Sequence, residues 1–393
     1  MFGWFKKIPT QGLAKKGLAL FFLLSLLYFL YFWRLGILTV GLSPAEAAAR
    51  TASGSLSEIA NNPIYAPHKL LQFVSQKLFG NGAADLRIVS SLSAVFFIFC
   101  FYHLVRGWFG KMVGFFATLF LAAVPWFVLS ARSATPTILL LAPLAILSCY
   151  YWAGRTKNVL AFYLLIAVAS LSLYVPGIVW LAIFGLIIGR QSLRGLMEEV
   201  SKLHKFIGAF AGTALIAPLV YASFKNFTVA KDLLLIPREW PSLIITVKSI
   251  AWSFLALFWR APTHGDFMIG RLPMLNVAQI ALVLFGCFAL WKLARNKSYT
   301  LIALACFGVV VSGINQNLFL LTLSLSAIAV AVAAGLRYLY MEWRTVFPKN
   351  PIPKYMAIGL IAALSALQIG YGLRYGLIAW PHTADTRTTY VIK

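Results

Sequence analysis

The chain has 393 residues, of which 61% are apolar and 11% are charged, and its mean hydropathy is +0.83. Soluble domains carry about 25% charged residues, so this composition excludes a water-soluble fold, which would expose large apolar patches. The formal net charge of +24 is explained by basic residues in the cytoplasmic loops of a membrane protein. We therefore expect an all-α polytopic membrane protein without a nucleic-acid partner.

Apolar runs of the length needed for membrane helices recur along the whole chain. The first follows basic residues and has no small-residue cleavage site close behind it, which predicts an uncleaved first span. The motif "LYVPG" at 173–177 predicts a tight turn that splits one long run into a helical hairpin. About eleven spans are expected, at 18–33, 88–105, 112–129, 137–153, 159–174, 178–189, 206–224, 277–293, 299–312, 318–336 and 355–377.

The charge distribution predicts the orientation of these spans. With a cytoplasmic N-terminus, most basic residues fall in short inner loops, beginning with Lys6, Lys7, Lys15 and Lys16. An odd number of spans then places the C-terminus outside, and the compact loops favour a bacterial plasma (inner) membrane. Most of the acidic residues are expected on the outer face, namely Glu46, Glu58, Asp85, Asp232, Glu239, Asp266 and Asp385.

Two segments between spans, 34–87 and 225–276, are long and fall on the outer face. The first contains "PHKLLQFVSQKLFG" and the second "PSLIITVKSIAWSFLALFW", which we interpret as interfacial or re-entrant helices; the second could instead be a twelfth span. An inner stretch, "RQSLRGLMEEVSKLHK", predicts an amphipathic surface helix. We expect one transmembrane domain over 1–377 and a short extracytoplasmic tail over 378–393.

Few residue patterns suggest chemistry within the spans. There is no phosphate-binding loop or dinucleotide fingerprint. The cysteines lie in apolar runs without metal-ligand spacing. Ionisable groups are almost absent from the spans, which argues against proton-coupled transport. No cofactor is predicted, and no tight acid cluster supports a divalent metal.

Charged side chains that could act chemically gather in the outer segments. Glu46 follows "LSP", where Pro44 can open a helix, so its carboxylate either caps that helix or serves as a proton acceptor. Basic groups could neutralise the phosphate of a membrane lipid, although each alone is more often an interface anchor. The outer candidates besides Glu46 are His68, Lys69, Arg132, His264, Asp266 and Arg271.

The order of several motifs resembles the GT-C superfamily of polytopic membrane glycosyltransferases, of the protein mannosyltransferase and aminoarabinose-transferase type. These motifs are "SPAEAAA", "PIYAPHKLLQ", "KLFG" and "ADLRIVSSL", followed by "RGWFGKMVGFFATLFLAAVPWFVLSARSATP" and "LYVPG", then "GRLPMLNVAQIALVLFG" and "GLRYLYMEWRTVFPKNP". The resemblance extends to about residue 377. It implies transfer of a sugar from a polyprenyl-phosphate carrier, with inversion, to an extracytoplasmic acceptor.

The resemblance also implies roles for individual residues. Glu46 falls on the second acid of the family's Asp-Glu pair, whose first position is Ala45 here, and Lys69 falls on the lysine of its "K-P-P" motif. The missing acid leaves three alternatives: Glu46 is the general base, Asp266 is the base, or the protein is inactive.

Three functions are therefore weighed. The first is a glycosyltransferase whose donor is a polyprenyl-phosphate-linked sugar and whose acceptor is an unknown glycan, lipid or protein. The second is an inactive lipid-carrier-binding or assembly protein, and the third is a transporter of lipid-linked sugars. In the first, Glu46 or Asp266 is catalytic. The groups expected to bind the lipid phosphate are His68, Lys69, Arg132, His264 and Arg271.

Overall fold

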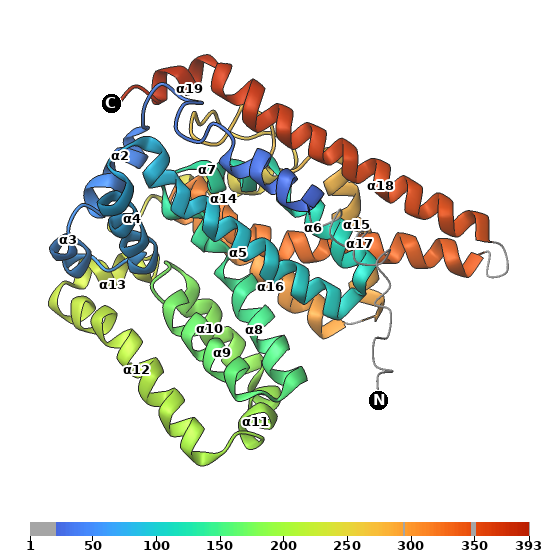
Figure 1. The fold of residues 1–393 in the computed structure, drawn as a ribbon, viewed down its shortest axis with the longest axis horizontal. Coiled ribbons are helices and arrows are strands. Elements are labelled where there is room, and N and C mark those ends of the chain that lie inside the picture. The colour runs from blue at the N-terminus through green and yellow to red at the C-terminus, as the bar shows by residue number, and fades with distance from the viewer. Residues whose placement is uncertain (1–20, 294, 347–350, 393) are drawn as a thin grey trace, which may run out of the picture.

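The computed structural model describes residues 21–293, 295–346 and 351–392 and is built from helices (Figure 1). The start of the first predicted span and the bases Lys6, Lys7, Lys15 and Lys16 lie outside this range. Within it, no extended strand forms, and an isolated antiparallel bridge pairs Leu42 with Ile392. The expected all-α architecture is therefore confirmed.

The helices follow the apolar runs of the sequence closely. A short π-helical turn, η1 (Tyr28–Phe32), ends the first apolar helix. The first half of the chain then contains α2 (Pro44–Ala52), α3 (Leu56–Asn61), α4 (Ala66–Phe79), α5 (Ala83–Phe109), α6 (Lys111–Ala122), α7 (Pro125–Arg132), η2 (Pro136–Leu141), α8 (Ala142–Thr156), α9 (Val159–Ser172), α10 (Ile178–Ile188) and α11 (Arg190–Glu198).

The second half begins with a long helix that lies beside α9 and continues into the second outer segment. Its helices are α12 (Lys202–Lys225), α13 (Phe227–Leu233), α14 (Leu243–Phe258), α15 (Val277–Leu293), α16 (Arg295–Ile314), η3 (Leu318–Leu321), α17 (Thr322–Val346), α18 (Pro351–Leu373), η4 (Arg374–Ala379), η5 (Trp380–His382) and α19 (Ala384–Thr389). Both predicted outer-segment helices form, as α4 and α14.

Within the described residues, every predicted span coincides with a helix, although the helices differ in length. Five are individually long and apolar enough to cross a membrane: Ala83–Phe109, Pro136–Thr156, Lys202–Lys225, Leu318–Trp343 and Tyr355–His382. Two more candidates are bent pairs, α6 with α7 at 64° and α10 with α11 at 77°. The remaining apolar helices are shorter, so the count of eleven stays a prediction.

The predicted amphipathic helix is divided into two parts. The stretch at 190–198 forms α11, which turns Leu196 into a small apolar cluster with Ala153 and Ala161. The following Ser201 accepts a hydrogen bond from the His204 amide, and this cap starts α12. A serine in an extended conformation is a strong helix-start signal, which is why one long surface helix does not form.

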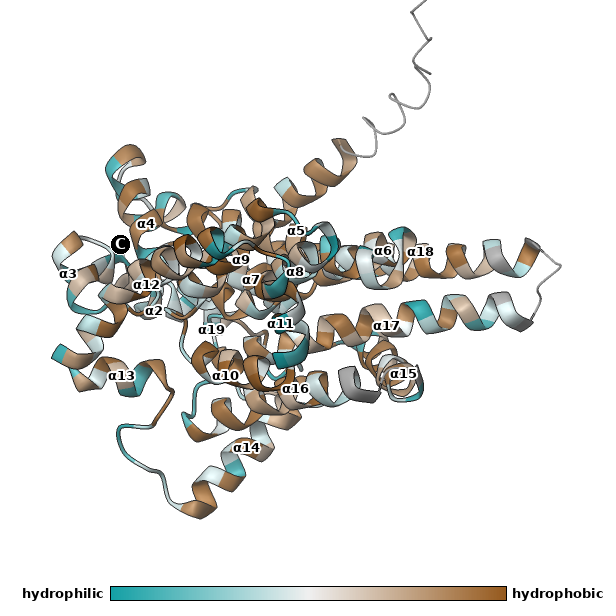
Figure 2. Cartoon of the chain, turned by 90° about the horizontal axis from the view of Figure 1, so that it is seen from below, coloured by the Kyte–Doolittle hydropathy of each residue, from teal (hydrophilic) through white to brown (hydrophobic). Residues whose placement is uncertain are grey.

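Helix α17 lies at the centre of the bundle. Its apolar window is 89% buried, against 22% for α12 and 28% for the span containing α18. Figure 2 shows apolar residues along these outer helices, as expected for surfaces that face lipid. Gly286 on α15 and Gly335 on α17 allow close contact, since a Cβ at Gly335 would lie 2.1 Å from the Leu282 carbonyl oxygen.

The predicted turn at 173–177 separates α9 from α10 and joins the two outer segments. The Tyr65 amide donates to the Tyr174 carbonyl at 2.8 Å, and the Gly177 amide donates to the Leu233 carbonyl at 2.9 Å. Gly177 has φ +81, and a Cβ there would lie 2.7 Å from Leu235 Cδ1, so glycine is required. Both outer segments are thus fixed to one turn.

The C-terminal tail lies at the same end of the molecule. The Leu42 amide donates to the Ile392 carbonyl at 2.7 Å, and the Ile392 amide returns a bond of 3.2 Å. Trp380 Nε1 donates to the Gly265 carbonyl at 3.0 Å. In Figure 1 the tail lies beside α2. Both long segments and the tail therefore share one side of the bundle, as the sequence predicts.

Candidate functional site

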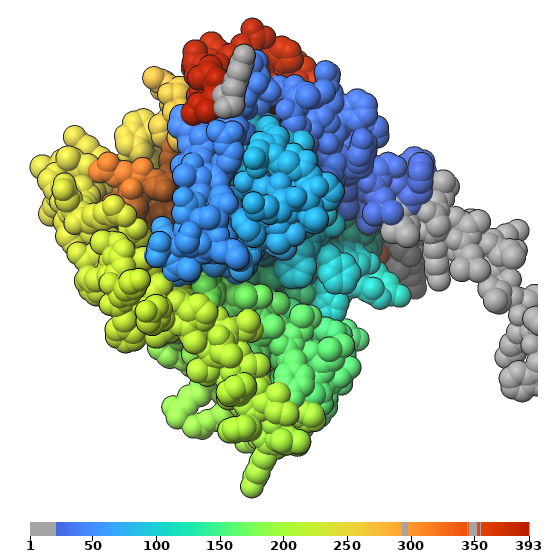
Figure 3. All heavy atoms as spheres, turned by 60° about the vertical axis from the view of Figure 1, so that its left-hand side comes forward, coloured from blue at the N-terminus to red at the C-terminus, as the bar shows by residue number. Residues whose placement is uncertain are grey.

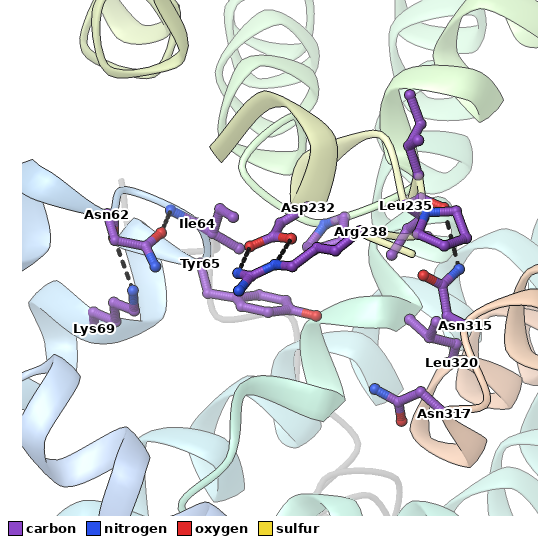
Figure 4. Close-up of a pocket in the computed structure, with 13 residues that line it drawn as sticks. Asn62, Ile64, Tyr65, Lys69, Asp232, Leu235, Arg238, Asn315, Asn317 and Leu320 are labelled. Atoms are coloured by element: carbon purple, nitrogen blue, oxygen red, sulfur yellow. Dashed lines mark hydrogen bonds and ion pairs between the residues drawn. The ribbon is translucent and has the colours of Figure 1, made fainter. Parts of the chain in front are cut away.

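A cavity of about 500 Å³ opens where the two outer segments, the 173–177 turn and the start of η3 meet. Figure 3 shows this face, with the blue first segment beside the yellow second segment and an orange segment between them. Figure 4 shows the lining. It consists of Asn62, Ile64, Tyr65, Lys69, Pro176, Asp232, Leu235, Ile236, Pro237, Arg238, Asn315, Asn317 and Leu320.

Lys69 supplies a nearly buried cation to this cavity from the first turns of α4. Its side chain is held by a 2.8 Å hydrogen bond from Nζ to the Asn62 carbonyl (Figure 4). No ion pair joins it to a carboxylate within the described part of the chain. Burial lowers the pKa of Lys69 to about 8, because the charged form loses its hydration. An anion entering the cavity would stabilise this ammonium.

Asp232 and Arg238 form an ion pair within the cavity lining. Arg238 donates Nη2 to Asp232 Oδ2 at 2.8 Å and Nε to Oδ1 at 3.3 Å. The Arg238 side chain is 71% exposed, so the guanidinium can move toward a ligand. A guanidinium has five N–H donors, and this pair uses two of them. The cavity therefore contains a second cation and a carboxylate.

His68 is adjacent to Lys69 in sequence but points away from the cavity into the protein. It is 1% exposed, and its Nε2 lies 2.9 Å from Ser90 Oγ. Burial lowers the pKa of His68 to about 3, with the positive charge of Lys69 acting in the same direction and Gln72 opposing both. His68 is therefore neutral at physiological pH and contributes no charge to phosphate binding.

Glu46 is fully buried at the start of α2, away from the cavity lining. It forms a capping box with Ser43, as the motif "LSP" allows. Its Oε1 accepts from Arg87 Nε at 2.9 Å and from the Ala134 amide at 2.8 Å, and its Oε2 accepts from Arg87 Nη2 at 2.6 Å. Both carboxylate oxygens thus accept hydrogen bonds from internal donors. Of the two roles predicted for Glu46, this arrangement corresponds to the helix cap.

Arg132 is also committed to internal contacts. It is 5% exposed, and it donates to the Leu30 carbonyl at 3.2 Å and to the Trp33 carbonyl at 2.8 Å. These carbonyls lie at the end of the first apolar helix, where backbone acceptors lack intrahelical partners. Arg132 therefore caps a helix end and does not line the cavity.

His264 and Asp266 are brought together in the second outer segment. His264 Nδ1 lies 3.6 Å from Asp266 Oδ2, and the His264 ring packs edge-on against Phe319 at 4.9 Å. Asp266 Oδ1 is buried without a hydrogen-bond partner among the described residues. Burial, followed by the negative charges of Glu46 and Asp266, raises the pKa of Tyr390 well above its usual value. Tyr390 of the tail is therefore close enough to both acids to feel their charges.

The predicted site residues consequently fall into separate groups. Lys69 lines the cavity, whereas Glu46, His68 and Arg132 are held in internal contacts. Arg271 is exposed and lies outside the lining. These side chains do not all meet in the lining of this cavity, because buried hydrogen-bond donors and acceptors occupy Glu46, His68 and Arg132.

Sequence reasoning missed Arg238, Asn315 and Asn317, and it noted Asp232 only as an outer acid. All four are polar and line the cavity. The six-residue separation of Asp232 and Arg238 matches no regular period, since the chain between them leaves α13 and turns. The sequence did contain one signal for them: the stretch "KDLLLIPREW" places several charged residues close together in a long outer segment. Long segments of this kind are more often functional than simple connections.

Within the described residues, no group of three His, Cys, Asp or Glu side chains is arranged to hold a metal ion.

Comparisons with known proteins were consistent with this fold. A family model described as dolichyl-phosphate-mannose-protein mannosyltransferase matches residues 67–221, a range that includes Lys69 and Arg132. The sequence has no significant match among curated proteins.

Solved structures match nearly the whole chain. ArnT from Cupriavidus metallidurans in the apo state matches with a TM-score of 0.60 and 15% identity, covering 95% of this chain and 78% of that one. The same enzyme bound to undecaprenyl phosphate gives 0.56 and 13%, covering 94% and 76%. An Archaeoglobus fulgidus oligosaccharyltransferase in complex with Zn and sulfate gives 0.51 and 15%, covering 93% and 52%. The predicted resemblance to GT-C membrane glycosyltransferases is therefore confirmed at the level of the fold.

Proposed function

We propose that this protein is a membrane glycosyltransferase that moves a sugar from a polyprenyl-phosphate carrier to an acceptor hydroxyl on the outer side of a plasma membrane. The observation that carries this proposal is the partly dehydrated Lys69 ammonium in a cavity at the end of the bundle. One structural relative was solved with undecaprenyl phosphate bound. The phosphate group of that lipid is an anion that such a cation would bind.

In this proposal, Lys69 and Arg238 neutralise the donor phosphate. Lys69 is a point charge, whereas Arg238 presents a planar fork that can contact phosphate oxygens while it still holds Asp232. Asn315 and Asn317 add amide groups on the far wall of the cavity. His68 is neutral and Arg132 is engaged elsewhere, so neither has a direct part in binding the phosphate.

Asp232 is the carboxylate that best fits the role of proton acceptor, because it lines the same cavity as Lys69. Glu46 supports the site indirectly by fixing Arg87 and the start of α2. Asp266 has one unpartnered oxygen and remains the alternative base. A general base must come within hydrogen-bond reach of the attacking hydroxyl, and of these two acids only Asp232 lines the cavity proposed to hold the donor.

The proposed step balances as a single displacement. The acceptor oxygen attacks the anomeric carbon while its proton passes to the Asp232 carboxylate. The bond from the anomeric carbon to the phosphate oxygen breaks, and its electron pair leaves with the polyprenyl phosphate. Lys69 and Arg238 stabilise the charge that develops on this leaving group.

A second candidate function is lipid-carrier binding without transfer. It is favoured by one observation: Glu46, the acid that aligns with the family's acidic pair, is locked in a buried ion pair with Arg87. A protein of this kind would bind polyprenyl phosphate and leave its sugar in place.

Binding can be tested with undecaprenyl phosphate itself. Native mass spectrometry of the full chain in nanodiscs should show saturable binding, weakened about 10- to 100-fold in Lys69→Gln, since a charge-assisted hydrogen bond contributes about 1.5–3 kcal/mol. Lys77→Gln is the matched control, because Lys77 lies on the same helix α4 outside the cavity lining. Equal affinity in wild type and Lys69→Gln would refute the phosphate site.

Transfer can be tested by release of undecaprenyl phosphate from undecaprenyl-phosphate-linked hexose or aminopentose in vesicles that contain the protein and a mixture of glycan, lipid and peptide acceptors. Asp232→Asn should abolish release and keep donor binding, whereas Asp266→Asn should keep both. The reverse pattern would move the base to Asp266. Donor binding without release by the wild-type protein would favour the non-catalytic function.

A further inference from the structure

A second cavity lies directly beside the first and is not used by the proposed donor. Its volume is about 390 Å³, and it is lined by Pro237, Arg238, Glu239, Trp240, Pro241, Ile314, Asn315 and Gln316. Pro237, Arg238 and Asn315 line both cavities. A molecule in the second cavity would therefore contact the same guanidinium that faces the donor phosphate.

The lining of this second cavity has a distinctive chemistry. Glu239, Gln316 and Arg238 are exposed, and together they offer carboxylate, amide and guanidinium groups that can bond to neighbouring hydroxyls in pairs. Trp240 is 70% exposed in the lining of this cavity. A large aromatic ring beside planar polar groups can cover the apolar C–H face of a pyranose while the polar groups bind its hydroxyls.

The position of this cavity also suits an acceptor. Arg238 lies at the boundary of the two cavities, and it holds Asp232 by two hydrogen bonds on the donor side. A hydroxyl of a molecule in the second cavity would thus reach the donor by passing Arg238. The Asp232 carboxylate, which Arg238 holds, lies on that path. The loop 234–241 supplies most of the lining, and the 314–316 turn supplies the rest.

We propose that the second cavity is the acceptor subsite and that the acceptor is a carbohydrate, whose terminal sugar stacks on Trp240 and is hydrogen-bonded by Glu239 and Gln316. This inference rests on the proposed function, because it assigns the acceptor class for the same reaction. It makes the protein an enzyme that extends or decorates a glycan.

The competing role for an exposed tryptophan is anchoring at the membrane interface. The two roles make different demands on the side chain. An interface anchor tolerates another apolar group, whereas sugar stacking requires an aromatic face. Trp240→Phe and Trp240→Leu therefore separate them.

The test uses the full chain in detergent on an array of oligosaccharides of two to six sugars. The wild-type protein should be retained on at least one glycan class. Trp240→Leu should weaken retention about tenfold, as for an aromatic binding hot spot. Trp240→Phe should keep most of the retention, and Glu239→Gln should lower it.

Two controls make the result specific. Trp259→Leu should behave as wild type, because Trp259 is 76% exposed in the same outer segment but lines neither cavity. Lys69→Gln should bind undecaprenyl phosphate more weakly and keep the glycan, so failure of the donor site and failure of the acceptor site are distinguishable. Retention on no glycan, or equal retention of Trp240→Leu and wild type, would overturn the inference.

Discussion

Arg87 Nη2 lies 2.6 Å from Glu46 Oε2, and the two side chains are 3% and 1% exposed. The same guanidinium donates to the carbonyls of Leu35 and Gly41, and it lies 5.6 Å from the centre of the Tyr390 ring. The pair thus joins the end of the first apolar segment, α2, α5 and the C-terminal tail. Its main effect is to organise the end of the bundle at which both long segments and the tail lie.

Glu46→Gln should therefore destabilise the protein by about 3–5 kcal/mol, because it leaves a buried guanidinium without its anion. Unfolding in detergent, followed by circular dichroism, measures this effect. Glu58→Gln is the control, since Glu58 is an exposed first-turn acid of α3 and should contribute about 0.3–1 kcal/mol. Wild-type stability in Glu46→Gln would show that the pair is dispensable.

His68 should make the protein sensitive to acid. Its folded pKa is about 3 and its unfolded value is about 6.5, so the unfolded chain binds more protons between these limits. Stability should then fall as the pH drops below 6.5, by up to about 1.4 kcal/mol for each pH unit.

The measurement is the melting temperature of the wild type and of His68→Gln from pH 7 to pH 4. His68→Gln should flatten the profile, while a variant of the exposed His382, His382→Gln, should not. Parallel profiles for His68→Gln and the wild type would contradict the assignment of a buried neutral imidazole.

Lys69 should make the affinity for undecaprenyl phosphate depend on pH. Its pKa in the empty site is about 8, so the ammonium is lost as the pH rises through and above this value, although a bound phosphate shifts the loss upward. The second pKa of a phosphate monoester is about 6, so the ligand is almost fully ionised and its charge nearly constant from pH 7.5 to about 10.

We expect the dissociation constant to rise between pH 7.5 and pH 10 at fixed ionic strength. Lys69→Arg should remain flat over this range, because a guanidinium stays protonated. A pH-independent dissociation constant in the wild type would show that Lys69 does not carry the interaction.

Gly335 on α17 should tolerate no side chain. Gly335→Ala would place a Cβ 2.1 Å from the Leu282 carbonyl oxygen on α15, and separating the two helices should lose about 1–3 kcal/mol of stability. Gly359→Ala on α18 is the control, since a Cβ there meets nothing within 4 Å. Thermal stability in detergent distinguishes them, and equal melting temperatures would contradict the close helix contact.

The helices and their ends were largely predictable, because apolar runs and local signals determine them. Pro44 opens α2 as expected, and the 173–177 motif ends α9. The partner of Glu46 was not predictable, because Arg87 lies 41 residues away, and Arg50, Lys69 and Arg132 were equally plausible from composition. Only the folded chain, in which the Arg87 side chain of α5 reaches Glu46 at the start of α2, selects among them.

The cavity illustrates the same limit. Lys69 was found because its motif is local, but Asp232 and Arg238 come together through an irregular turn that has no sequence period. His68 shares its motif with Lys69 but points from a different side of α4, toward Ser90. Two adjacent residues on a helix therefore enter different environments, and a linear motif does not show which side of the helix each one faces.

The bridge between Leu42 and Ile392 constrains the topology by parity. Since these two residues are joined by backbone hydrogen bonds, they lie on the same side of the membrane. The chain must therefore cross the membrane an even number of times between them. Five long helices and two bent pairs make seven crossings in that interval if each pair counts once. An odd number of the shorter apolar helices that follow residue 42 must then cross as well. There are four of them: Val159–Ser172, Leu243–Phe258, Val277–Lys292 and Ser298–Ile314. The total is even if the exposed helix α14 (Leu243–Phe258) does not cross and the other three do.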